Sequence, residues 1–159
     1  MSVAFTKEED SESNAANLPD RPISPHPNLV TSSGLALLDA ALAQARAAYG
    51  AAQVAAEVKA DRTAMARATR DLRYYVARRA SAQLMEPAPD GETLSFGGTV
   101  TVERDDGRHQ SFRIVGEDEA DPSNGALSYI SPLAQAVLGK RAGDVATLPG
   151  GEVEVVAVG

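Results

Sequence analysis

Apolar residues in the first half of the chain recur at alternating steps of three and four, which is the spacing of a helical heptad seam. In residues 33–59 this seam consists of Leu35, Leu38, Leu42, Ala45, Tyr49, Ala52 and Ala56. In residues 62–86 a second seam consists of Met65, Ala68, Leu72, Tyr75 and Ala82, interrupted by Arg79. Neither stretch contains proline, and Thr31, Ser32 and Ser33 offer N-caps, so we predict an antiparallel helical hairpin over residues 31–86 that buries both seams.

After Pro87 the pattern changes to the apolar and polar alternation that is typical of strands. Residues 96–116 alternate on both sides of Asp105, Asp106 and Gly107, which predicts a β-hairpin with an Asp-Gly turn. LSYIS follows, then a short helix with Ser131 as N-cap, Pro132 as its first residue and Gly139 as C-cap, then strands in DVATL and EVEVVAV. The predicted fold class is therefore α+β, with a helical hairpin followed by a small antiparallel sheet domain over residues 92–159.

The first thirty residues are polar and acidic and then rich in proline, with prolines at positions 19, 22, 25 and 27. Proline removes backbone donors and biases the preceding residue away from helix. We therefore interpret residues 1–30 as a disordered start that leads into an extended arm. A docking motif for a proline-recognising domain is the alternative to a plain tether. His26 has no second ligand near it in sequence, so an exposed side chain is the better interpretation than a metal site.

The formal charge is uneven along the chain. It is -3 in residues 1–30, +4 in residues 31–85 and -8 in residues 86–159, which gives -7 overall. A basic middle between acidic flanks indicates that the hairpin and the C-terminal domain meet different partners. The 159 residues contain no cysteine, which excludes disulfides and thiolate chemistry. The acidic N-terminus and the lack of a long apolar run predict a cytoplasmic protein with no membrane partner.

Four carboxylates cluster in the sequence GEDEAD, directly after the strand that ends near Val115: they are Glu117, Asp118, Glu119 and Asp121. A calcium loop that began at Glu117 would need glycine at its sixth position and a carboxylate at its twelfth, where the chain has Pro122 and Ser128. Acid/base catalysis is disfavoured, because this domain has no cysteine to act as a companion nucleophile and no histidine besides His109. We expect an exposed loop that binds Arg or Lys of a protein partner; a merely solvated loop is the competing interpretation.

Residues 96–158 closely resemble the C-terminal domain of the GreA/GreB transcription elongation factors. The resemblance lies in RIVGEDEAD, in Gly125 after a short gap, and in LSYISPLAQAVLGKRAGDV. It implies an FKBP-like domain that docks on RNA polymerase at the mouth of the secondary channel, while the coiled coil enters the channel. The implied docking surface consists of Glu117, Asp118, Glu119, Asp121, Ser131, Pro132 and Leu133. The hairpin matches that family in architecture but only loosely in sequence.

In family members that promote cleavage of backtracked RNA, two acidic residues at the coiled-coil tip help to hold a Mg2+ ion of the polymerase. Here the tip reads AAEVKADRT, and the available carboxylates are Glu57 and Asp61, in reversed order and four apart. They share one helix face if the helix continues. The competing interpretation is a solvated pair beside Lys59 and Arg62. The hairpin is also shorter than in those members by roughly one heptad per arm, about 10 Å of reach. In this it resembles the regulator of nucleoside diphosphate kinase, which binds polymerase without such a tip.

The second arm is rich in arginine, with six of them against Asp71. Arg67, Arg70, Arg73 and Tyr74 share a side of the helix, which suits contacts to RNA phosphates and stacking on bases. A basic patch on the coiled coil contacts RNA in the family that the chain resembles. A solubilising helix face is the equally weighted alternative.

The leading hypothesis is a monomeric polymerase-binding elongation factor with no chemistry and no cofactor of its own, sharing Mg2+ with the polymerase if it supports cleavage. A non-cleaving regulator that occupies the channel is the alternative. Prolyl isomerase activity is disfavoured, because the aromatic residues from position 86 onward are Phe96, Phe112 and Tyr129. A free-standing nucleic-acid binder is disfavoured by the overall charge of -7.

Overall fold

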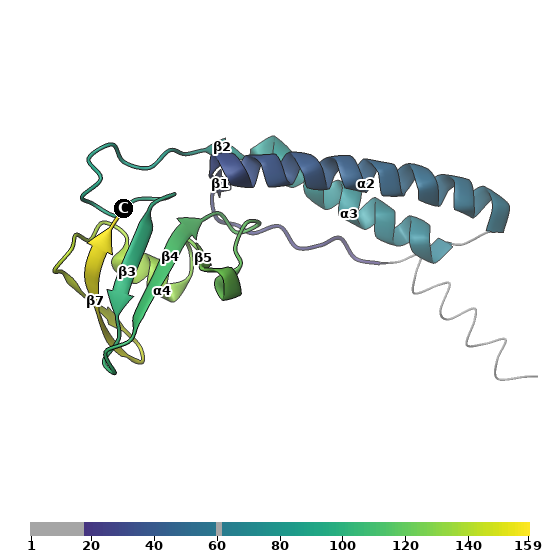
Figure 1. Ribbon diagram of the computed structural model, residues 1–159. Helices are drawn as coiled ribbons and strands as arrows, with labels where there is room; N and C mark the ends of the chain where they lie inside the picture. The colour runs from purple at the N-terminus through teal and green to yellow at the C-terminus, as the bar shows by residue number, and fades with distance from the viewer. Residues whose placement is uncertain (1–17, 60–61) are drawn as a thin grey trace, which may run out of the picture. The chain divides into compact units, whose positions relative to one another are not determined.

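The computed structural model describes residues 18–59 and 62–159. They form two compact units, a hairpin unit containing Leu38–Ser81 with the arm up to His26, and a sheet unit containing Pro27–Leu37 and Ala82–Gly159. The predicted α+β class is confirmed, because a helical hairpin precedes a sheet domain with one short α-helix (Figure 1). Among the helices that the structure describes, none is long and apolar enough to cross a membrane.

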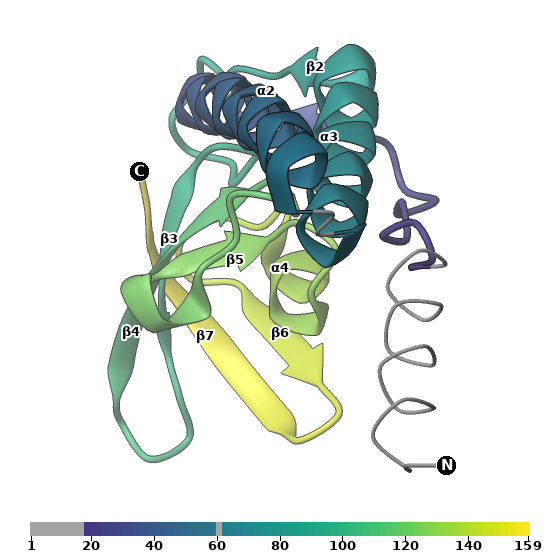
Figure 2. The same cartoon turned by 90° about the vertical axis from the view of Figure 1, so that its right-hand side faces the viewer.

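The hairpin is formed by α2 (Ser32–Lys59) and α3 (Arg62–Ser81), which lie side by side in Figures 1 and 2. The buried positions of the predicted seams are Leu38, Leu42, Ala45 and Ala52 on α2 and Ala68 on α3. An ion pair between Arg79 and Asp39, 2.5 Å from Nε to Oδ1, joins the two helices where the second seam is interrupted. The heptad interpretation is thus confirmed, with alanines at the contact.

The second helix ends at Ser81, five residues before the predicted end at position 86. Instead of continuing the helix, Gln83–Leu84 form the short strand β2, which pairs in parallel with β1 (Leu29–Val30). The backbone N–H groups of Gln83 and Met85 donate to the carbonyls of Asn28 and Val30, at 2.8 and 2.9 Å. Pairing with a segment more than fifty residues away therefore overrides the local helical pattern, and the last two residues of the predicted arm form β1.

The described part of the arm, residues 18–28, contains no helix or strand, and the predicted disordered start lies in residues 1–17, outside the described residues. Within the hairpin unit the arm contacts α3. Arg21 forms an ion pair with Asp71 at 3.4 Å, and its guanidinium carbon lies 3.9 Å from the centre of the Tyr74 ring. His26 is exposed, as expected.

The sheet domain has five strands in the order β5-β4-β3-β7-β6. They are β3 (Thr99–Glu103), β4 (His109–Val115), β5 (Ala126–Ser128), β6 (Val145–Leu148) and β7 (Gly151–Val158). The β3–β4 hairpin is confirmed, with Gly107 at φ +83 in its turn, a conformation that only glycine adopts without strain. The prediction of an antiparallel sheet is wrong at one edge, since β4 and β5 are parallel and the sheet is mixed.

The short helix α4 (Pro132–Val137) begins as predicted, with the Ser131 hydroxyl accepting from the N–H of Ala134 and proline at the first helical position. Its C-cap is Leu138 rather than Gly139, which follows in the left-handed conformation at φ +82. Ala134 and Val137 of α4 are completely buried against the sheet. Their partners in the core are Leu94, Val100, Val102, Ile114, Leu127, Ala146, Val153 and Val155.

Candidate functional site

The acidic loop and the start of α4 leave the sheet at the same edge. This follows from the parallel pairing of β4 with β5, because parallel neighbours have their carboxyl ends side by side. Val115 ends β4 opposite Ser128 at the end of β5, and the N–H of Tyr129 donates to the Val115 carbonyl at 2.8 Å. The acidic loop follows the first strand, and the loop into α4 follows the second. The structure thus brings together two segments that the sequence separates by ten residues.

A third segment, residues 27–34, lies at the same edge of the sheet unit. A Cβ atom at Gly116 would collide with the Leu29 carbonyl oxygen, so only glycine permits this approach of β1 to the start of the acidic loop. The Tyr129 hydroxyl donates to the Pro27 carbonyl at 2.6 Å. The sequence pattern did not indicate this contact, because residues 27–30 read only as the end of a proline-rich arm.

Glu119 is turned inward toward this third segment. Its carboxylate accepts hydrogen bonds from the Thr31 hydroxyl at 2.5 Å and from the Ser33 hydroxyl at 2.6 Å. Arg113 of β4 lies 3.5 Å from the same carboxylate and also donates to the Ser33 hydroxyl at 2.9 Å. The Glu119 side chain is only 10% exposed. We call Glu119, Thr31, Ser33 and Arg113 the Glu119 clamp.

Thr31 has a double role in the clamp. Its hydroxyl accepts from the N–H of Gly34 at 3.0 Å and its carbonyl accepts from the N–H of Leu35 at 2.9 Å, so it is the N-cap of α2. The same hydroxyl donates to Glu119, and Thr31 is 2% exposed. The clamp therefore fixes the first turn of α2 to the acidic loop. The sequence named Thr31 and Ser33 as N-caps but gave no signal for their partner 86 to 88 residues away.

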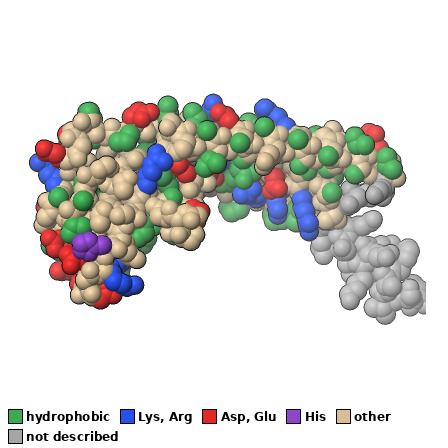
Figure 3. Space-filling view, in the orientation of Figure 1, with side chains coloured by type: hydrophobic (Ala, Val, Ile, Leu, Met, Phe, Trp, Pro, Cys, Tyr) green, Lys and Arg blue, Asp and Glu red, His purple; other side chains and the backbone are tan. Residues whose placement is uncertain are grey.

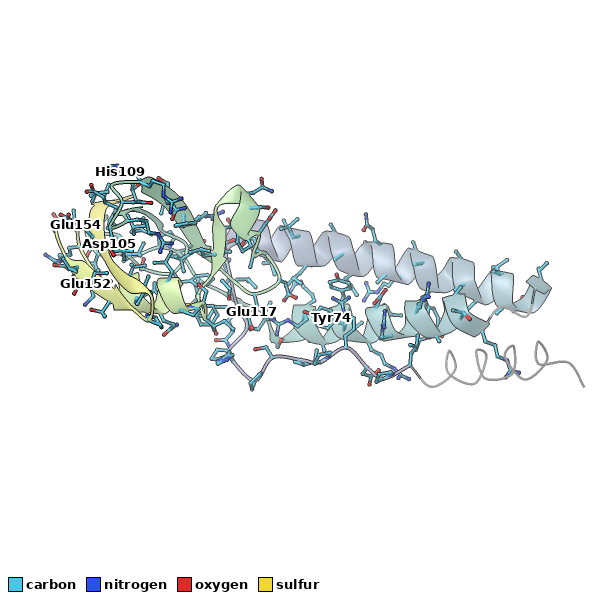
Figure 4. All side chains as sticks on the ribbon, turned by 90° about the horizontal axis from the view of Figure 1, so that it is seen from below. Tyr74, Asp105, His109, Glu117, Glu152 and Glu154 are labelled. Atoms are coloured by element: carbon cyan, nitrogen blue, oxygen red, sulfur yellow. The ribbon has the colours of Figure 1, made fainter. Side chains whose placement is uncertain are left out.

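The other predicted docking residues have different surroundings. Asp121 is exposed and accepts hydrogen bonds from the Asn124 amide at 2.6 Å and the Ser123 hydroxyl at 2.8 Å. These two hydrogen bonds hold the pKa of Asp121 below its ordinary value, and the bond from Asn124 has the larger effect. They also fix the turn formed by the 3-10 helix η1 (Pro122–Asn124). Glu117 and Asp118 are half-buried, and Figure 4 shows Glu117 at the end of the sheet domain opposite to Glu152 and Glu154.

At the start of α4, Pro132 is exposed and Ser131 is half-buried, while Leu133 packs against the hydrophobic core. The predicted docking set thus contains two kinds of residue. Glu119 and Leu133 make internal contacts that stabilise this edge of the sheet domain. Asp121 and Pro132 are exposed on its surface.

At the hairpin tip, Glu57 is exposed near the end of α2, while Asp61 lies outside the described residues. Of the predicted nucleic-acid contacts on α3, Arg67 is exposed, Arg70 is half-buried, and Arg73 lies 3.3 Å from the Asp20 carboxylate of the arm. The Tyr74 ring packs edge-on against Tyr75 with centroids 5.1 Å apart, and the Arg21 guanidinium covers its face. That face was expected to stack on bases. Figure 4 shows Tyr74 on α3.

The fold and the site define a protein of two parts, a helical hairpin and a mixed sheet domain with an acidic edge. Residues 88–159 match the family model described as transcription elongation factor, GreA/GreB, C-terminal. The transcription elongation factor GreA of Methylococcus capsulatus is 38% identical over 126 residues, which cover 74% of this chain and 78% of that protein. A match of that extent includes part of the hairpin, because the chain from residue 82 onward is less than half of the sequence. The chain belongs to the GreA/GreB family of transcription elongation factors.

Other relatives are matched over a shorter range. The transcription elongation factor GreA of Ralstonia nicotianae is 47% identical over 81 residues, which cover 47% of this chain and 51% of that protein. The chain thus spans about half the length of several of the curated relatives that it matches. Among solved structures, GreA factor homolog 1 of Thermus thermophilus is 24% identical and covers 84% of this chain and 99% of its own, with a TM-score of 0.39.

Proposed function

We propose that this chain binds RNA polymerase and acts as an elongation factor on paused or backtracked complexes, through the secondary channel and without chemistry of its own. The observation that carries the proposal is the family match, which extends from the sheet domain into the hairpin. The proposed division of labour follows the charges. The acidic sheet domain docks on the protein partner, and the basic hairpin meets the nucleic acid.

The proposed docking surface is the edge where the acidic loop meets the start of α4. Residues 86–159 carry a formal charge of -8, which suits a partner surface rich in Arg and Lys. Asp121 and Pro132 are exposed at this edge, and Glu117 and Asp118 are half-buried in it. Glu119 contributes as a positioning residue, because its carboxylate holds the loop against Thr31 and Ser33.

The hairpin is the element that we propose to enter the secondary channel. With 28 residues α2 is about 42 Å long, and with 20 residues α3 is about 30 Å long. Lys and Arg side chains lie on the α3 side of the hairpin in Figure 3. Arg67 is exposed there and suits a contact with RNA phosphates.

Support of transcript cleavage would require tip carboxylates that share the polymerase Mg2+ ion. In the described part of the tip this leaves the exposed carboxylate of Glu57, with Asp61 outside the described residues. Mg2+ takes octahedral oxygen ligands, so support of cleavage would need both tip carboxylates to reach the ion.

The second candidate function is a channel regulator that competes with other channel factors and does not promote cleavage. Two observations favour it. The tip carboxylates Glu57 and Asp61 stand beside Lys59 and Arg62 in the sequence, and α3 has only 20 residues before the chain leaves the helix at Ser81. The two functions differ in whether Glu57 and Asp61 matter.

The test is an RNA-cleavage assay on stalled, backtracked complexes of the cognate polymerase, with a parallel binding measurement. We compare the wild type with Glu57→Ala/Asp61→Ala and with Asp118→Ala/Asp121→Ala. Glu152→Ala is the matched control, since this exposed carboxylate lies at the opposite end of the sheet domain. For either function we expect loss of binding in the loop variant alone. Transcript shortening that depends on the tip identifies a cleavage factor, and binding without shortening identifies the regulator. Equal binding by the loop variant and the control would refute the docking surface.

A further inference from the structure

The hairpin unit contains a cavity of about 320 Å3 between the arm and the two helices near the tip. Its lining contains three arginines of α3, which are Arg62, Arg70 and Arg73. The lining also contains apolar side chains, among them Leu18 of the arm and Met65 of α3. The volume is at the lower end of the range of about 300–1,000 Å3 that is usual for small-molecule sites. It suits a ligand of the size of a single nucleotide.

The charge of the cavity is positive. Asp20 of the arm is the one acidic residue among its described lining residues, so the three guanidinium groups leave a formal charge of +2. Asp20 lies 3.3 Å from Arg73, and both side chains are about two-thirds exposed, at 65% and 67%. An ion pair with this exposure contributes little free energy, and an incoming anion can displace Asp20 from Arg73. The charge of +2 matches a phosphate monoester dianion better than a carboxylate.

Arg70 is less exposed than Arg73 in this cavity, at 32% against 67% for the side chain. Its Nε atom is buried and has no hydrogen-bond acceptor among the described residues. The Asp71 carboxylate oxygen is 3.7 Å away, beyond hydrogen-bond distance. A buried donor without an acceptor is unfavourable, and a guanidinium fork pairs well with two phosphate oxygens. Because the Nε atom is buried, a phosphate in this cavity would pair with the Nη groups of Arg70, whose side chain is partly exposed.

We propose that this cavity binds a nucleoside phosphate, with the phosphate group held by Arg62, Arg70 and Arg73 and the sugar or base packed against Leu18 and Met65. A free mononucleotide and the phosphorylated end of an RNA chain present the same chemistry. The site includes the arm, so it is distinct from contacts of RNA phosphates along the exposed helix face. It does not depend on the proposed polymerase binding, because the isolated chain is sufficient for the test.

The experiment is calorimetric titration of the full chain at low ionic strength with four probes. They are inorganic phosphate, adenosine monophosphate, and a five-nucleotide RNA with and without a 5′-phosphate. We expect one site per chain and at least tenfold tighter binding of a nucleoside phosphate than of inorganic phosphate. Preference for the mononucleotide assigns a free nucleotide, and preference for the 5′-phosphorylated RNA assigns an RNA end. Equal binding of both RNA probes without binding of the mononucleotide overturns the proposal in favour of the helix face.

Variants localise the site. Arg70→Gln should weaken binding at least tenfold, and Arg70→Lys should weaken it severalfold, because lysine keeps the charge but lacks the guanidinium fork. Arg46→Gln is the control, since Arg46 is an exposed arginine of α2 outside the lining of the cavity. Circular dichroism confirms that each variant is folded. Equal losses in the Arg70 and Arg46 variants would show a general charge effect and overturn the proposal, as would wild-type affinity in Arg70→Gln.

Discussion

Replacement of Glu119 by alanine tests the Glu119 clamp. It removes the acceptor of two short hydrogen bonds, from Thr31 at 2.5 Å and from Ser33 at 2.6 Å. Hydrogen bonds to a charged group contribute about 1.5–3 kcal/mol each. Ser33 is exposed, so water can replace its lost acceptor, but Thr31 is 2% exposed and its hydroxyl keeps only the Ser33 hydroxyl, 3.0 Å away, as an alternative acceptor. The ion pair with the 42% exposed Arg113 adds less than about 1 kcal/mol.

We therefore expect Glu119→Ala to lower the free energy of unfolding by about 2–4 kcal/mol. Glu119→Gln keeps the volume and one acceptor, so it should cost about half as much. The measurement is urea unfolding followed by circular dichroism, with the exposed Glu152→Ala as control, expected within about 0.5 kcal/mol of wild type. A double-mutant cycle with Thr31→Val should give a coupling above about 1 kcal/mol. A loss below about 0.5 kcal/mol for Glu119→Ala, or no coupling, would refute the clamp.

Three further predictions concern other described contacts. Gly50 lies in open space on α2, so Gly50→Ala should stabilise the protein by about 0.5–1 kcal/mol in the same unfolding assay. Gly34→Ala should destabilise it, because the added Cβ would lie 2.7 Å from the Glu119 carboxylate. Hydrogen bonds lower the folded-state pKa of Asp121, so its contribution to the free energy of unfolding is present above the unfolded-state pKa of about 3.9 and is lost as the pH falls through the folded-state pKa. Asp121→Asn should therefore make the free energy of unfolding less dependent on pH below about pH 4 in acid titrations. An unchanged profile would contradict this. Arg21→Ala removes the contact 3.9 Å from Tyr74 and should lower the melting temperature, with a cost of about 1 kcal/mol; an unchanged melting temperature would argue against arm docking.

Much of the local structure could be predicted from the sequence. Seam residues such as Leu38 and Leu42 are buried, Gly107 lies in the predicted turn, and Ser131 with Pro132 begins α4. Each of these features depends on residues within a few positions of one another. Side-chain periodicity, a cap and a turn glycine carry that information without reference to the rest of the chain.

The pairing of distant segments could not be predicted. Periodicity shows which face of a strand is buried, but it does not identify the neighbouring strand or its direction. The parallel edge of β4 with β5 and the pairing of β1 with β2 were therefore missed. The pairing with β1 also ended α3 at Ser81, because backbone donors that a helix would use bond to Asn28 and Val30.

For the candidate site, the sequence by itself determined the cluster of carboxylates, the α4 N-cap and the basic face of α3. Only the tertiary structure decided which carboxylate faces inward. The carboxylates of GEDEAD look alike in sequence, yet Glu119 binds Thr31 and Ser33 while Asp121 binds Asn124 and Ser123. Similarly, only the fold placed Arg21 over Tyr74. The physical reason is that a polar side chain takes its role from the donors and charges around it, and here some of those come from segments more than fifty residues away.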